Sequence, residues 1–164
     1  MTVIESVVNW IEGGVINSWV VGSAWVWPTL EILHFVGLSL LLGAIVVVDL
    51  RMAGLIRSLE LTAVTRLLPL AGLGFLINVT TGVLFFFGDP ARYSVNVGFQ
   101  IKMLLVVLAG VNALWFFMKI EPQVQHWTPG SAPPLTARLV GVTSLATWFG
   151  VLLLGRLIPY IGTG

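Results

Sequence analysis

Four ionisable side chains lie inside long apolar stretches of the sequence, and their types could hold a redox cofactor. They are Glu31, His34, Lys102 and Arg156. An ionisable group is costly in hydrocarbon, so each is a candidate functional residue by default. Imidazole is a good axial ligand for haem iron, and Lys and Arg side chains can pair with anionic haem propionates. The four types therefore fit a haem b site in which His34 is the metal ligand and the other three residues bind the cofactor.

The composition indicates that lipid surrounds most of this chain. Hydrophobic residues make up 57% of the 164 positions and charged residues 9%, whereas soluble domains carry about 25% charged residues. The net charge of +1 gives no reason to expect nucleic acid as a partner. The chain contains no cysteine, which excludes disulfides and thiolate sites.

Four apolar segments are long enough to cross a bilayer, at about 20 residues each. We expect spans at about 28–48, 67–87, 97–118 and 139–158, and hence an all-α integral membrane four-helix bundle formed by one domain, 1–164. Residues 3–22 differ, because their apolar positions follow a helical period and four tryptophans crowd the segment before Pro28: Trp10, Trp19, Trp25 and Trp27. We interpret them as an interfacial helical segment that Gly13 and Gly14 break.

The basic residues predict the orientation. Arg51, Arg57 and Arg66 lie in the loop after the first span, and Lys119 and Arg138 flank the third loop. These loops are expected to face the cytoplasm, which leaves both termini outside a bacterial inner membrane. Asp49 and Arg51 are interpreted as groups at the cytoplasmic end of the first span.

This topology places the four ionisable groups at one depth, in the outer leaflet. Glu31 and His34 share a helix face at spacing i, i+3 and lie about 4 and 9 Å below the outer end of their span. Lys102 lies about 7 Å and Arg156 about 3–5 Å below the outer ends of theirs. His126, in the third loop, lies on the opposite side. The second axial position is open to water, Met103, a residue of another chain, or nothing.

A purely structural alternative uses the same four residues. Lys102 and Arg156 would snorkel to the surface and Glu31 would pair with one of them. His34 would then donate a hydrogen bond to a backbone carbonyl. The residue types leave both interpretations open.

Two stretches resemble known families. One is Trp27-Pro28-x-x-Glu31-x-x-His34-x-x-Gly37, which runs on to Asp49-Leu50-Arg51-x-x-Gly54-Leu55, and the other is Gln100-x-Lys102-Met103. The whole chain resembles an uncharacterised family of bacterial four-helix inner-membrane proteins. More distantly it is similar to HemJ-type protoporphyrinogen oxidases and to CopD-type membrane domains. The HemJ-type resemblance implies haem b with His34 as axial ligand and Lys102 beside the haem or substrate.

The expected function is a b-type haem membrane protein with a redox or electron-transfer role. Its partners would be membrane lipid and either quinone or a membrane redox complex. The sequence leaves open whether the chain forms a homo-oligomer. Two alternatives are a non-catalytic subunit or scaffold of a larger complex and a HemJ-like protoporphyrinogen oxidase. Transport is a weaker alternative, because the spans show no paired discontinuous segments.

Overall fold

The computed structural model describes residues 3–124, 127 and 130–161, and within them the chain is helical with no strand. Four helices are long and apolar enough to cross a membrane. They are α3 (Val26–Ala53), α5 (Leu68–Gly88), α7 (Val97–Trp115) and α9 (Leu135–Leu157). These helices match the four expected spans, so the prediction of an all-helical chain with four long apolar helices is confirmed.

Helix α3 is longer than expected, and its ends follow local rules. Pro28 lies in its first turn, where a missing N–H costs nothing. The helix ends at Gly54, whose φ of 83° is a left-handed conformation that favours glycine. The N–H of Leu55 then donates to the Leu50 carbonyl at 3.0 Å. With 28 residues, α3 is about 42 Å long, so Asp49 and Arg51 lie within the helix.

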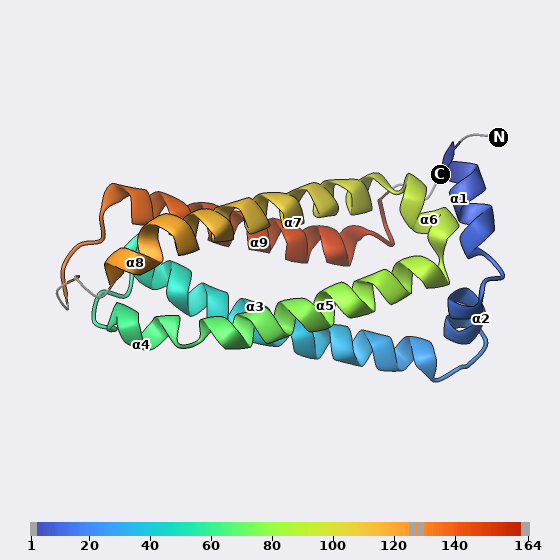
Figure 1. The fold of residues 1–164 in the computed structure, drawn as a ribbon, viewed down its shortest axis with the longest axis horizontal. Helices are drawn as coiled ribbons and strands as arrows, with labels where there is room; N and C mark the ends of the chain where they lie inside the picture. The colour runs from blue at the N-terminus through green and yellow to red at the C-terminus, as the bar shows by residue number, and fades with distance from the viewer. Residues whose placement is uncertain (1–2, 125–126, 128–129, 162–164) are drawn as a thin grey trace.

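The long helices form two antiparallel pairs, α3 with α5 and α7 with α9 (Figure 1). Helix α3 also packs along α9, whereas α5 and α7, both fully described, make few contacts. Glycines permit the closest approaches. A Cβ on Gly74 would lie 2.5 Å from the Gly37 carbonyl oxygen, and one on Gly141 would lie 2.8 Å from the Asp49 carbonyl oxygen. Helix α3 is therefore the central helix of the bundle.

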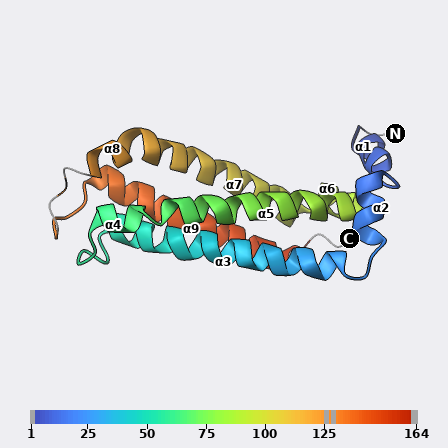
Figure 2. The ribbon, with the colours of Figure 1, turned by 60° about the horizontal axis from the view of Figure 1, so that its bottom comes forward.

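The N-terminal segment forms two short helices, α1 (Val3–Ile11) and α2 (Val15–Val21). The break occurs at Gly13, with φ 76°, as the two glycines predicted. Both helices lie across one end of the bundle in both ribbon views (Figures 1 and 2). The Asn17 side chain attaches α2 to the end of α5 by donating to the Phe87 carbonyl at 2.8 Å.

The connections divide between the two ends of the bundle (Figure 1). The short helix α6 (Pro90–Val95) lies at the end that holds α1 and α2, which we call the α6 end. Helices α4 (Leu61–Thr65) and α8 (Glu121–Val124) lie at the opposite end, which we call the α4 end. Helix α7 passes into α8 through a π-helical turn, Phe116–Ile120, so the third helical run extends past the expected limit at 118.

Asn96 holds the α6 end together. It is fully buried, and its side chain accepts from the Phe99 N–H at 2.9 Å, which caps α7. The same side chain donates to the carbonyls of Ile158 and Ile161 at 3.0 and 2.6 Å. One amide therefore fixes the start of α7 against the end of α9.

Candidate functional site

The structure places two of the four predicted site residues within electrostatic range of each other, His34 of α3 and Lys102 of α7. Both side chains are half-buried. The Lys102 ammonium is near enough to the His34 ring to act on it electrostatically. The two helices belong to different antiparallel pairs, so the charge of Lys102 acts on a ring from the other half of the bundle.

A hydrogen bond to Thr81 of α5 determines how the His34 ring is held. His34 Nδ1 lies 2.7 Å from Thr81 Oγ1. The Thr81 hydroxyl donates within its own helix, to the Ile77 carbonyl at 2.8 Å. With the hydroxyl proton on this carbonyl, the Thr81 lone pair accepts from Nδ1–H of His34. This assignment leaves the lone pair of the neutral ring on Nε2, the nitrogen that could bind a metal or accept a proton.

Close packing of α3 on α5 positions this hydrogen bond. The Gly37–Gly74 contact lies one helical turn from His34, and it lets α5 approach near enough for Thr81 to reach the ring. The edge of the His34 ring also contacts Phe85, with centroids 5.6 Å apart. The ring is therefore held from one side by α5, and Lys102 approaches from α7.

Lys102 extends along α9 at a position where that helix has no side chain. A Cβ on Gly155 would lie 3.4 Å from Lys102 Nζ. Gly155 therefore leaves space for the ammonium between α7 and α9, toward the α6 end. In this position a cation could hold an anionic group of a ligand bound near His34.

Glu31 and Arg156 lie at the surface. Glu31 is exposed and accepts from Trp27 Nε1 at 3.1 Å, rather than from a cation. Arg156 is exposed, and its guanidinium carbon lies 5.4 Å from the centre of the Tyr160 ring. The structure therefore brings neither residue to the His34–Lys102 pair.

Tyr93, on α6, lies outside the long helices and near the exposed Glu31. Burial raises the pKa of the Tyr93 phenol, and the nearby Asp89 and Glu31 carboxylates act in the same direction, whereas Arg92 opposes them. The Tyr93 ring packs on Phe99 with centroids 5.2 Å apart. Helix α6 is thus packed onto the start of α7 just beyond the His34–Lys102 pair.

The geometry does not support Met103 as a second axial ligand to a metal at His34. Met103 is 44% exposed, so it faces outward from the bundle while its neighbour Lys102 faces inward. His126 lies outside the described residues. Among the residues that the structure describes, no group of three or more His, Cys, Asp or Glu side chains could hold a metal ion. A metal at His34 would therefore depend on a cofactor's own ligands.

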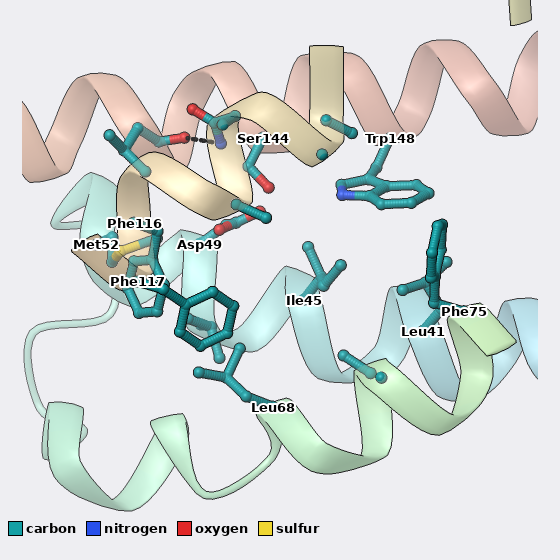
Figure 3. A pocket seen from close by; sticks show the side chains of 18 residues that line it. Leu41, Ile45, Asp49, Met52, Leu68, Phe75, Phe116, Phe117, Ser144 and Trp148 are labelled. Atoms are coloured by element: carbon teal, nitrogen blue, oxygen red, sulfur yellow. Dashed lines mark hydrogen bonds between the residues drawn. The ribbon is translucent and has the colours of Figure 1, made fainter. Parts of the chain in front are cut away.

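The structure contains a second polar location that the sequence analysis missed. A cavity of about 240 Å³ lies in the half of the bundle toward the α4 end (Figure 3). Asp49 lines it and is 3% exposed, so this residue near the end of α3 faces the interior of the bundle rather than the surface. Arg51 is 1% exposed and donates from Nε to the Leu59 carbonyl at 2.5 Å, so it too is buried rather than interfacial.

The Asp49 carboxyl has an incomplete set of partners. Ser144 of α9 lies beside it and interacts with it, and the two side chains point toward each other in Figure 3. The second carboxyl oxygen, Oδ2, is buried and has no hydrogen-bond partner among the described residues. Such an atom in a native structure calls for an explanation, for example a missing ligand.

The apolar stripe of α3 could have revealed Asp49. Leu38, Leu41 and Ile45 continue the His34 face of that helix. Four residues further, the same face carries Asp49. Ending the first span at 48 hid this continuation, because a residue beyond the span was taken as interfacial.

Comparisons with known proteins do not assign a family to this chain. No family model, no curated protein and no solved structure matches the chain.

Proposed function

We propose that the chain is a four-span protein of the bacterial inner membrane, with the α6 end outside and the α4 end in the cytoplasm. The lengths and hydropathies of the four helices support this proposal. Exposed basic residues at the α4 end support the orientation, because cytoplasmic loops carry an excess of Lys and Arg. They are Arg57, Arg66, Lys119 and Arg138. Exposed tryptophans at the α6 end, including Trp10 and Trp25, fit an outer interface.

We further propose that the protein binds haem b through His34 and serves a redox or electron-transfer role. The observation that carries this proposal is the His34–Thr81 hydrogen bond, which orients the ring through Nδ1 and leaves Nε2 as the ring nitrogen that would bind the iron. Lys102 would hold an anionic edge of the cofactor. A bound haem would supply a one-electron redox centre, and quinone or a membrane redox complex would exchange electrons with it.

The test is an absorption spectrum of the purified protein, as isolated and after addition of haemin. Wild type should show a haem band, and His34→Ala should lose it. Thr81→Val should retain the fold but weaken haem binding about 10- to 100-fold, as loss of an outer partner of a metal-bound histidine typically does. Thr80→Val is the matched control, because Thr80 is exposed and its hydroxyl donates within α5, to Leu76.

The HemJ-like alternative uses the same two residues, His34 and Lys102. Rescue of a strain that lacks protoporphyrinogen oxidase would support this enzyme activity. Growth that depends on both residues would link the activity to the site, whereas failure of a well-expressed protein to rescue the strain would reject it.

A second candidate function is that of a non-catalytic subunit of a larger complex. Four exposed apolar side chains on and just after α1 and α2 favour it, since they could contact a partner at the outer surface: Trp10, Val15, Trp19 and Trp25. A stoichiometric partner that co-purifies without a chromophore would support this role. A partner that remains bound after these side chains are replaced by serine would reject this docking surface.

A further inference from the structure

We propose that the Asp49 cavity binds the head group of a membrane-soluble quinone or quinol, with the Asp49 carboxyl and the Ser144 hydroxyl as its polar partners. This site is separate from His34. The two residues are 15 positions apart on one helix, which is about 22 Å. The inference therefore goes beyond haem binding at His34 and does not depend on it.

Asp49 supplies the recognition group. A buried polar atom without a partner costs about 1–3 kcal/mol, so a ligand that pairs with Oδ2 gains affinity from a group that is already desolvated. A carboxylate accepts a hydrogen bond from a quinol hydroxyl, and a protonated carboxyl donates to a quinone carbonyl. One residue can therefore bind both members of the quinone–quinol pair.

The walls of the cavity suit a flat apolar ring. Apart from Asp49, Asn112 and Ser144, the lining side chains are apolar or glycine. The Asn112 amide is already engaged, because it donates to the Val140 carbonyl at 3.2 Å. Trp148 and Phe75 close the side away from Asp49, with ring centroids 6.2 Å apart (Figure 3). A ring could thus lie against aromatic faces while its polar edge meets Asp49 and Ser144.

The cavity opens sideways, between α5 and α7. Its lining residues from α3 and α9 are mostly buried, whereas Gly72 and Phe75 of α5, Gly110 of α7 and Phe117 of the π-helical turn are exposed. Helices α5 and α7 make few contacts, so they form a mouth rather than a closed wall. In a bilayer this mouth faces lipid, through which a quinone could enter and leave.

The size of the cavity matches a head group rather than a whole lipid. About 240 Å³ is just below the 300–1,000 Å³ range of small-molecule pockets. The hydrocarbon tail would therefore leave through the mouth and stay among lipid chains. This arrangement needs no space inside the bundle for the tail.

Two glycines at the mouth allow a direct test of entry. A Cβ on Gly72 or on Gly110 would meet nothing within 4 Å, so larger side chains can be introduced there without a clash at Cβ. Gly43 of α3 is the matched control, because it is exposed, equally open and does not line the cavity.

The experiment is equilibrium binding of a radiolabelled benzoquinone with a decyl tail to the full protein in nanodiscs, with empty nanodiscs as background. Wild type should bind it saturably. Gly110→Leu should abolish saturable binding, and Gly43→Leu should bind like wild type. His34→Ala should also bind the quinone like wild type. Quinone binding at the Asp49 cavity and haem binding at His34 can therefore fail independently of each other.

Asp49→Leu tests the polar partner. It should fold at least as well as wild type, because it removes a buried carboxyl oxygen that has no hydrogen-bond partner, and its thermal denaturation checks this. Its affinity for the quinone should fall at least about tenfold, since hydrogen bonds to charged groups contribute about 1.5–3 kcal/mol.

Three results would overturn the proposal. The first is a wild type that shows no saturable binding. The second is quinone affinity that is unchanged in both Asp49→Leu and Gly110→Leu. The third is saturable binding of decylamine in place of the quinone, which would make the Asp49 cavity a site for lipophilic cations.

Discussion

Replacing Gly74 by alanine should separate α3 from α5 and disturb the ring of His34. The added Cβ would lie 2.5 Å from the Gly37 carbonyl oxygen and 2.6 Å from the Leu41 nitrogen. Both neighbours are backbone atoms of α3, so no side-chain rotation relieves the contact. Ordinary contact begins at 3.4 Å, and α3 must therefore move by about 0.9 Å.

The stability cost can be worked from two opposing terms. Overpacking of a tight interface costs about 1–3 kcal/mol, and alanine favours the helix over glycine by roughly 0.5–1 kcal/mol. The net expectation for Gly74→Ala is a destabilisation of about 0–2.5 kcal/mol relative to wild type, and of about 1–3 kcal/mol relative to an alanine at an open position of the same helix. A movement of α3 by about 0.9 Å along the His34–Thr81 hydrogen bond would lengthen the distance between His34 Nδ1 and Thr81 Oγ1 from 2.7 Å to about 3.6 Å. That distance is too long for a hydrogen bond.

The assay is unfolding by SDS titration in dodecylmaltoside micelles, followed by circular dichroism. Gly82→Ala is the control, because Gly82 lies on the same helix and a Cβ there meets nothing within 4 Å. The control should unfold at the same SDS fraction as wild type or a higher one. Equal unfolding midpoints for Gly74→Ala and Gly82→Ala would refute the close helix contact on which the position of His34 depends.

Three further predictions concern the ends of the helices. Asn96→Ala should lower the free energy of unfolding by about 2–4 kcal/mol, measured by the same titration, because it leaves one buried and two partly buried backbone groups without their partner. Gly54→Ala should cost about 1–2 kcal/mol in that assay, because φ is 83° there. Burial raises the pKa of Tyr93 above its usual 10.0, so its phenolate absorbance, isolated by comparison with Tyr93→Phe, should appear at higher pH than that of free tyrosine. The stability that Tyr93 contributes should be complete below about pH 10 and fall as the pH rises further.

Each of these three predictions has an outcome that contradicts it. An Asn96→Ala variant as stable as wild type would contradict the role of that amide in joining α7 to α9. An unchanged Gly54→Ala would contradict the left-handed end of α3. A Tyr93 phenolate that forms at the pH of free tyrosine would contradict the burial of that phenol.

The long helices could be predicted from the sequence because hydropathy and length depend on local composition. Pro28 near the start of α3 and Gly13 at the break between α1 and α2 act through their own backbone preferences, and the structure has both features where expected. Residues 125–126 lie outside the described part of the chain, so the interpretation of His126 as a solvated loop residue stays a prediction.

The environment of each polar side chain depended on neighbours that a sequence does not display. Glu31 and His34 share a helix face, yet Glu31 is exposed and accepts from Trp27, whereas His34 is half-buried and bonded to Thr81 of α5. Depth along a span can be counted from residue numbers, whereas rotation toward a partner helix cannot. The burial of Asp49 depends on the contact of α9 with α3 through Gly141, a long-range pairing.

Haem binding through His34 is tested most directly by the absorption spectrum of the full protein after haemin is added in detergent. Wild type is expected to give a haem band that is absent in His34→Ala, weakened in Thr81→Val and unchanged in Thr80→Val. A wild type without a haem band, or a band that persists unchanged in His34→Ala, would contradict the central claim.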